Sequence, residues 1–148
     1  MAKEVSAGVV IFRRNKEIKY LVLKYGLGHW DFVKGNIKKD EEEVAALRRE
    51  ATEEAGITDL QLYKDFNERI NYFYKKDKEL IFKRVIYYVG ETKTKKITLS
   101  FEHTDYRWLP YNRALKQITY KTSKDTLVKA HTFILEKIKN KKLDEFIT

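Results

Sequence analysis

The first part of the chain contains short apolar runs rich in β-branched residues, separated by polar turns. Two such runs, Val5–Phe12 and Ile18–Tyr25, flank the polar turn Arg13–Glu17, so they predict a β-hairpin. Gly26–His29 is predicted as a loop, and Trp30–Phe32 as a short extended piece. We therefore expect the chain to begin with strands.

Helical spacing begins at about Asp40 and continues to Ala55. Apolar residues recur there at steps of three and four, namely Val44, Leu47, Ala51 and Ala55. At 100° per residue these positions fall within one arc of about 80° on a helical wheel. Asp40 is a suitable N-cap residue, and Gly56 supplies a C-terminal stop. The segment is therefore predicted as one amphipathic helix.

The second half returns to strands before it ends in helices. Strands are predicted around Leu62–Phe73 and Glu79–Glu91, with a third short one at Lys96–Leu99. The segment Thr104–Pro110 leads into a short helix near Asn112–Gln117. A final helix follows, in which Ser123 is the expected N-cap and the apolar stripe is Leu127, Ala130, Ile134 and Ile138.

This order of elements predicts an α+β or mixed α/β/α layered fold. With 148 residues, 43% of them hydrophobic, residues 1–148 are expected to form a single domain. The chain has no cysteine, which excludes disulfides and thiolate metal sites. No apolar run approaches the ~18 residues of a membrane span, and the N-terminus lacks the layout of a signal peptide. A cytoplasmic location is therefore expected.

Charge is distributed unevenly along the chain. The formal net charge is +9, which suggests an anionic partner such as a nucleic acid, a nucleotide or a membrane surface. Lys-rich faces that only keep the protein soluble would give the same total. The segment from Asp40 to Glu54 nevertheless holds seven acidic residues and two arginines, a local net charge of −5. The predicted helix thus gathers negative charge within a basic protein.

The acidic residues near the C-terminal end of this helix break two local rules. Glu50 forms like-charge pairs with Glu53 and Glu54 at i,i+3 and i,i+4, and each pair costs a few tenths of a kcal/mol. The helix dipole also disfavours anions at this end. A solvated acidic face would explain residues 41–43 but not these. Carboxylates converging from adjacent turns, without His or Cys, favour a hard-oxygen site for Mg²⁺ or Mn²⁺ that also binds phosphate.

The residues around this helix match a known motif. Gly35, Glu41 and the run Arg49–Ile57 fit the Nudix box, GX5EX7REUXEEXGU, at the right spacing. Only Ala51 departs, because a bulky aliphatic residue is usual there. The chain thus resembles the Nudix hydrolases, which implies an α/β/α sandwich around a mixed sheet. It also implies Mg²⁺-dependent hydrolysis of a nucleoside diphosphate linked to another group.

The resemblance assigns roles to the residues of the box. Glu50, Glu53 and Glu54 correspond to the metal ligands, with Mg²⁺ or Mn²⁺ as the ion. Arg49 and Glu41 are expected to hold the loop, helix and loop together through an ion pair. The α+β fold and the metal site are thus implied together.

Four further segments resemble the diadenosine tetraphosphate hydrolases of this family: Trp30–Asn36 (WDFVKGN), Arg69–Phe73 (RINYF), Val85–Glu91 (VIYYVGE) and Leu99–Leu109 (LSFEHTDYRWL). This resemblance implies that Glu102 is an additional carboxylate, as a metal ligand or as the base that activates water. It also implies that Lys34 meets phosphate and that Tyr87 stacks an adenine. If the strand prediction holds, Tyr87 and Tyr88 point to opposite faces, so only one of them can stack a base.

Other residues around the predicted site carry weaker assignments. Val33 and Asn36 stand where this subfamily usually has proline and histidine, so they change the mouth of the site. Lys83 and Arg84 are further candidates for binding phosphate, arginine being the better bidentate partner. His103, next to Glu102, is a candidate for touching phosphate or acting as an acid.

The expected reaction is asymmetric hydrolysis of diadenosine tetraphosphate, a dinucleoside polyphosphate, to ATP and AMP. No membrane partner and no stable nucleic-acid partner are expected. The alternatives are a nucleoside triphosphate pyrophosphatase, an RNA 5′-pyrophosphohydrolase and a non-catalytic nucleotide- or RNA-binding module. The clustered glutamates argue against the last, because a binding module does not need them.

Overall fold

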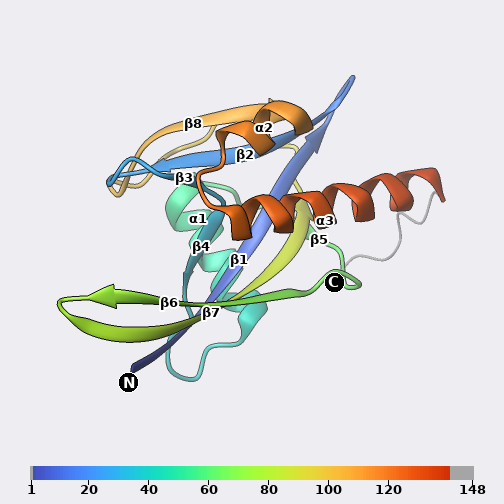
Figure 1. Ribbon diagram of the computed structural model, residues 1–148. Helices are drawn as coiled ribbons and strands as arrows, with labels where there is room; N and C mark the ends of the chain where they lie inside the picture. The colour runs from blue at the N-terminus through green and yellow to red at the C-terminus, as the bar shows by residue number, and fades with distance from the viewer. Residues whose placement is uncertain (1, 141–148) are drawn as a thin grey trace.

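A computed structural model describes residues 2–140 of the chain (Figure 1). The strands are β1 Ala2–Arg14, β2 Ile18–Tyr25, β3 Trp30–Asp31, β4 Val33–Asn36, β5 Gln61–Leu62, β6 Glu68–Lys76, β7 Glu79–Glu91 and β8 His103–Pro110. The helices are α1 Glu43–Ala55, α2 Tyr111–Gln117 and α3 Lys121–Lys139. No helix among residues 2–140 is both long and apolar enough to cross a membrane.

All the strands belong to one mixed sheet whose centre is the parallel pair of β1 and β7. The N-terminal half of β1 pairs with β4, through Ser6↔Asn36 to Val9↔Val33. Its C-terminal end pairs with β2, which confirms the predicted hairpin. Strand β1 thus changes its antiparallel neighbour along its length, from β4 to β2.

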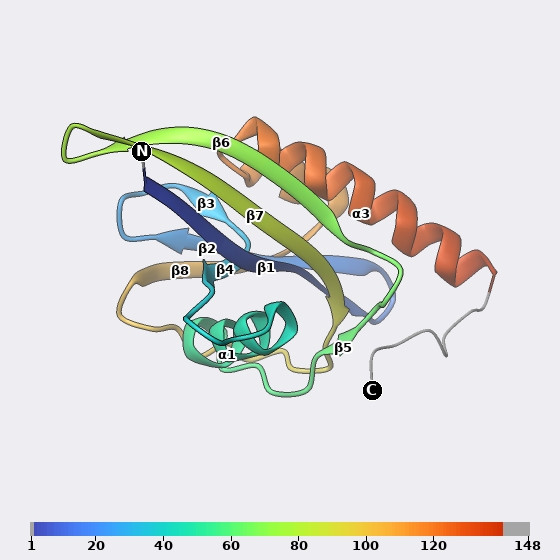
Figure 2. The same cartoon turned by 90° about the horizontal axis from the view of Figure 1, so that it is seen from below.

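Both faces of the sheet are covered, as Figure 2 shows: α1 lies on one side of β1 and β7, and α3 on the other. Successive side chains of β1 alternate between the two faces. Val10 packs in the core that includes Leu127 of α3, and Val9 in the core that includes Leu47 of α1. The fold is therefore the expected α+β sandwich, with helices on both faces of a mixed sheet.

Helix α1 begins two residues later than predicted. Its N-cap position is Glu42, and Asp40 lies in the preceding turn with a φ of 62°, so the prediction of Asp40 as N-cap is wrong. The side chain of Glu41 explains the difference, because it turns back to accept a hydrogen bond from the backbone N–H of Lys38. The chain therefore completes a turn before the helix starts. Gly56, with a φ of 69°, ends the helix as predicted.

Three predictions for the second half need correction. Lys96–Leu99 is a loop and not a strand. A hydrogen bond from the N–H of Thr98 to the carbonyl of Ala55 attaches this loop to the end of α1. The run predicted at Leu62–Phe73 divides into β5 and β6. Helix α3 begins at Lys121, so Ser123 lies inside the helix, where it is buried, and is not the N-cap.

Candidate active site

Gly35 on β4 allows the helix and the sheet to approach closely. A Cβ atom at this position would lie 2.0 Å from Cδ of Glu50 and 2.1 Å from its Oε1. Any larger residue would therefore displace the Glu50 carboxylate. This close approach is the physical reason for a glycine 15 residues before Glu50 in the box.

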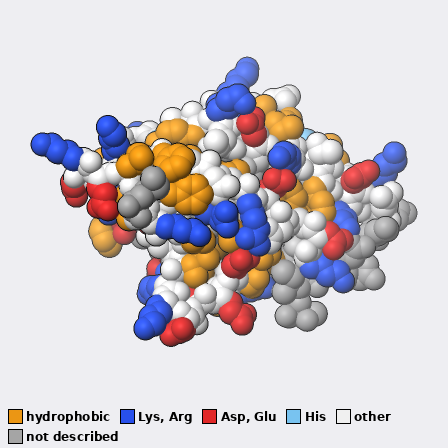
Figure 3. Space-filling view, turned by 60° about the horizontal axis from the view of Figure 1, so that its bottom comes forward, with side chains coloured by type: hydrophobic (Ala, Val, Ile, Leu, Met, Phe, Trp, Pro, Cys, Tyr) orange, Lys and Arg blue, Asp and Glu red, His pale blue; other side chains and the backbone are white. Residues whose placement is uncertain are grey.

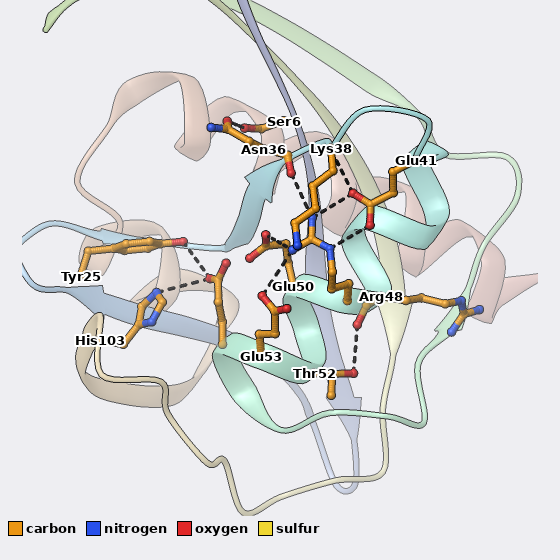
Figure 4. A network of polar contacts seen from close by, with 12 residues as sticks. Ser6, Tyr25, Asn36, Lys38, Glu41, Arg48, Glu50, Thr52, Glu53 and His103 are labelled. Carbon is orange, nitrogen blue, oxygen red and sulfur yellow. Dashed lines mark hydrogen bonds and ion pairs between the residues drawn. The ribbon is translucent and has the colours of Figure 1, made fainter.

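Arg49 is the centre of the polar network drawn in Figure 4. Its Nε and Nη2 donate to the two carboxylate oxygens of Glu41 at 2.8 and 2.9 Å, a bidentate pair. Its Nη2 also donates to the carbonyl of Asn36 at 3.0 Å, and its Nη1 to Glu50 at 2.7 Å. Hydrogen bonds from Arg49 and from the Lys38 N–H lower the pKa of Glu41 to about 2. The predicted ion pair of Arg49 with Glu41 is confirmed.

Glu54 is a buried carboxylate in the last turn of α1, only 5% exposed. The hydroxyl of Tyr25 donates to its Oε1 at 3.4 Å, and Nε2 of His103 lies 3.3 Å from the same oxygen (Figure 4). Burial, and then the hydrogen bond and charge of Glu50, raise the pKa of Glu54 well above its ordinary value. At the unfavourable acidic end of α1, Glu54 is therefore enclosed in a specific buried site, whereas Glu53 is exposed.

A cavity of about 630 Å³, which we call the carboxylate pocket, gathers the predicted metal ligands. Glu50, Glu53 and Glu54 line it from α1, and Glu102 lines it from the loop that precedes β8. Glu102 thus lies in the same cavity as the glutamates of α1, although it is about 50 positions away from them in the sequence. The structure brings all four predicted carboxylates together.

These carboxylates fit a divalent cation by their chemistry, although they are not arranged as a finished metal site. Within residues 2–140 no three Asp, Glu or His side chains already surround one point. Arg49 accounts for this, because its Nη1 holds Glu50 at 2.7 Å and Glu53 at 3.3 Å. The donors are all hard carboxylate oxygens, and Glu50 and Glu54 are close enough to be hydrogen-bonded. Such a set suits Mg²⁺ or Mn²⁺.

A second cavity, of about 580 Å³, lies beside the first and has a different lining, so we call it the aromatic pocket. Its aromatic residues are His29, Tyr72, Phe73, Tyr74 and Tyr120. The rings of His29 and Tyr120 lie 5.4 Å apart. No local pattern in the sequence predicts Tyr120 as part of this pocket. Ile70, Tyr72 and Tyr74, in contrast, alternate along β6 and so share one face, which period-two spacing can predict.

Lys34 and Lys83 line both cavities and join them. The ammonium of Lys34 lies 3.2 Å from Oδ2 of the fully buried Asp31. Burial lowers the pKa of Lys34, but the charge of Asp31 and contact with Tyr72 outweigh it, so the pKa is raised overall. The predicted phosphate-binding lysines thus stand at the junction of the two cavities.

Asn36 holds the second of these lysines. Lys83 Nζ donates to Asn36 Oδ1 at 2.7 Å and lies 3.4 Å from Glu4, while Ser6 donates to the same amide oxygen at 2.8 Å. Burial is the main reason that the pKa of Lys83 is lowered. The two lysines therefore differ in their partners. The charge of Lys34 is compensated by the buried carboxylate of Asp31, whereas Lys83 is held mainly by the amide of Asn36. Val33, the other departure from the subfamily pattern, is buried in the core that includes α1.

Tyr87 does not have the position expected of a residue that stacks a base. It is fully buried in the α3-side core, where its ring meets Phe32 edge-on at 5.7 Å. Tyr88 is also buried, on the other face, and its hydroxyl donates to Glu43 at 2.9 Å. The prediction that Tyr87 stacks an adenine is therefore wrong, because helices cover both faces of β7.

Two other predicted substrate contacts also need correction. The guanidinium of Arg84 donates to Asn71 at 2.9 Å, and Arg84 lines neither the carboxylate nor the aromatic pocket. His103 has a buried side chain behind Glu54, and its Nδ1 lies 2.9 Å from the hydroxyl of Ser100. Burial lowers the pKa of this imidazole. His103 supports Glu54 and does not face the space in which phosphate would lie.

Comparison with known proteins extends the similarity far beyond the box. The NUDIX domain family matches residues 2–130. The chain is 33% identical over 142 residues to the asymmetrical bis(5′-nucleosyl)-tetraphosphatase of Mus musculus, across 87% of this chain and 94% of the mouse protein. It is 33% identical over 102 residues to the 8-oxo-dGTP diphosphatase of Buchnera aphidicola, across 68% of this chain and 72% of that protein. A crystal structure of a C. elegans Ap4A hydrolase binary complex superposes with a TM-score of 0.80 and 29% identity, covering 90% of this chain and 98% of that one.

Proposed function

The chain belongs to the Nudix family of hydrolases, and we propose that it hydrolyses diadenosine tetraphosphate asymmetrically to ATP and AMP. The observation that carries this proposal is the continuity of two cavities of different chemistry through Lys34 and Lys83. An aromatic pocket suits a base, two lysines suit a polyphosphate, and a cluster of carboxylates suits a divalent cation. The identity to the mouse tetraphosphatase supports the same substrate class.

We propose that Glu50, Glu53, Glu54 and Glu102 hold Mg²⁺ or Mn²⁺. When bound, the ion would neutralise phosphate charge and make water a stronger nucleophile. Arg49 keeps Glu50 oriented through the bidentate pair with Glu41. Glu102 approaches the polyphosphate from the loop before β8, whereas the other three carboxylates approach from α1.

Lys34 and Lys83 bind the phosphates between the base and the carboxylates. Each ammonium is held by neighbouring groups, Lys34 by Asp31 and Lys83 by Asn36, so little side-chain freedom is lost when phosphate binds. His29, Tyr72 and Tyr120 surround one adenine. Because the base pocket and the carboxylates lie a fixed distance apart, water attacks at one end of the polyphosphate, and the products are ATP and AMP rather than two ADP.

A nucleoside triphosphate pyrophosphatase is the second candidate function, because the 8-oxo-dGTP diphosphatase of Buchnera aphidicola has the same percentage identity over a shorter span. Such a substrate has a single base, which would occupy the aromatic pocket while its phosphates reach the carboxylate pocket. An RNA 5′-pyrophosphohydrolase would need a surface that follows a chain of nucleotides. On the face shown in Figure 3, Lys and Arg side chains are spread among acidic and apolar ones. We expect no stable nucleic-acid partner and a cytoplasmic location.

The test is to incubate the protein with a panel of nucleotide substrates, in the presence of Mg²⁺ or Mn²⁺ or of a chelator, and to separate the products by chromatography. We expect kcat/KM to be highest for diadenosine tetraphosphate, with ATP and AMP as the only products and no turnover after chelation. In ¹⁸O-water the label should enter AMP alone. Formation of two ADP, or a higher kcat/KM for 8-oxo-dGTP or for triphosphorylated RNA, would contradict the proposal and assign the chain another Nudix activity.

A further inference from the structure

Two large apolar side chains are almost completely exposed on neighbouring loops. Leu27 is 96% exposed and Phe101 95% exposed, whereas the other exposed large hydrophobic residues among residues 2–140 range from 41% to 57%. The two loops are joined, because the N–H of Gly26 donates to the carbonyl of Glu102 at 2.9 Å. Leu27 and Phe101 therefore lie at the same end of the molecule.

The position of Phe101 ties this exposure to the carboxylate pocket. Phe101 lines that pocket beside Glu102, and its loop carries the one proposed metal ligand that does not come from α1. Single exposed hydrophobic residues are common on protein surfaces. A phenylalanine that is nearly free of protein contacts, but belongs to the wall of a polar cavity, has a face available to a ligand.

The substrate class supplies such a ligand. A dinucleoside polyphosphate carries two bases, and the aromatic pocket encloses one of them. Its phosphates then pass Lys34 and Lys83 toward the carboxylates, because these lysines line both cavities. The second nucleoside must leave the carboxylate pocket on the side away from the first. Two aromatic residues, Tyr25 and Phe101, line this pocket without lining the other. The hydroxyl of Tyr25 donates to the carbonyl of Phe32 and to Glu54, whereas Phe101 is almost completely exposed, so Phe101 is the ring available to a base.

We propose that Phe101, with Leu27 beside it, forms a platform on which the second base of a dinucleoside polyphosphate stacks. The inference rests on the proposed function and extends it to substrate selection. A stacked base contributes roughly 1–3 kcal/mol, which corresponds to about 5- to 150-fold in affinity. The platform would favour substrates with two nucleosides over those with the same phosphates and a single base.

The experiment compares two substrates that differ only in the second nucleoside: diadenosine tetraphosphate and adenosine 5′-tetraphosphate, the latter measured as a substrate or as a competitive inhibitor. In Phe101→Ala we expect KM for diadenosine tetraphosphate to rise about 5- to 10-fold with kcat nearly unchanged. The KM or Ki of adenosine 5′-tetraphosphate should stay the same. Phe101→Trp should retain the wild-type KM, because it restores a ring.

Leu135→Ala is the matched control, since Leu135 is a 48%-exposed apolar residue on α3 that lines neither cavity. An equal effect of Phe101→Ala on both nucleotides, or a loss of kcat alone, would overturn the platform and indicate an action through the neighbouring Glu102. Unchanged kinetics with diadenosine tetraphosphate would also overturn it while leaving the proposed function intact. If the wild-type protein does not cleave diadenosine tetraphosphate at all, the proposed function fails and the platform fails with it.

Discussion

The carboxylate pocket and the aromatic pocket share two lysines but hold their other residues by different forces. In the carboxylate pocket, Arg49 fixes Glu41 and Glu50 by hydrogen bonds of 2.7 to 2.9 Å. In the aromatic pocket, rings such as His29 and Tyr120 contact each other at 5.4 Å. Charge that is held in place stabilises a transition state, whereas ring surfaces bind a base equally well before and during the reaction. Changes to the charged groups held in the first pocket should therefore lower kcat, and changes to the rings of the second should raise KM.

The largest expected effect comes from Glu54→Gln in the carboxylate pocket. The change keeps the size of the side chain and removes a charge from the proposed metal site, so we expect at least a hundredfold loss of kcat, roughly 2.7 kcal/mol of barrier. The melting temperature in metal-free buffer should stay the same or rise, because glutamine is already neutral, whereas burial beside Glu50 raises the pKa of Glu54 and makes its ionised form unfavourable. Glu79→Gln, at an exposed position on β7, is the control. Near-normal Mg²⁺-dependent turnover in Glu54→Gln would refute the metal assignment.

Gly35→Ala tests the same pocket without removing a charge. The new methyl group would occupy the place of the Glu50 carboxylate, which must swing away. A displacement of about 1 Å at a reacting centre can cost about 100-fold, so we expect kcat to fall 30- to 100-fold while the fold remains stable. The effects of Gly35→Ala and Glu50→Gln should not add in the double variant, since both act through Glu50. Additive losses would indicate that Gly35 acts in another way.

In the aromatic pocket, Tyr72→Ala should raise KM about tenfold and leave kcat within about twofold, because base stacking is mostly uniform binding. Tyr72→Phe retains the ring and should restore KM. Steady-state kinetics with diadenosine tetraphosphate measure both parameters. A loss of kcat that exceeds the rise in KM would remove the distinction between the two pockets.

The smallest effect is expected for Tyr87→Phe. Because Tyr87 is fully buried and its ring is enclosed by the core, neither kcat nor KM should change by more than about twofold. A change in the melting temperature without a kinetic effect would fit this position. A several-fold rise in KM would instead show that the hydroxyl of Tyr87 contacts the substrate, because phenylalanine retains the ring.

The two pockets also differ in how far the sequence predicted them. Gly35, Glu41, Arg49, Glu50 and Glu54 lie within 20 residues, and helical spacing alone places the glutamates on neighbouring turns. The ion pair of Arg49 with Glu41 was predicted from the resemblance to the Nudix box, since Glu41 lies before the helix. What the spacing could not predict is the burial of Glu54, which depends on Tyr25 and on His103 from β8.

The aromatic pocket is assembled from segments that lie far apart, so its members carry no common local signal. His29, Tyr72 and Tyr120 come from a loop, an edge strand and the residue before α3. Tyr87 was assigned wrongly because strand parity gives the face of a side chain but not whether that face is open. In this sheet both faces are covered, and Tyr87 and Tyr88 are therefore both buried.

The parallel pairing of β1 with β7 has a consequence for the order in which the protein is made. Ala2 is opposite Ile81, so the first strand waits for its main neighbour until about 79 more residues have been synthesised. At roughly 5–20 residues per second, this takes several seconds on the ribosome. The β1–β2 hairpin can form early, but α1 lies between the two partners in the sequence and cannot complete its core before β7 emerges. Nascent chains that end before Glu79 should therefore be sensitive to proteases and dependent on chaperones, whereas chains that extend past Glu91 should begin to resist digestion.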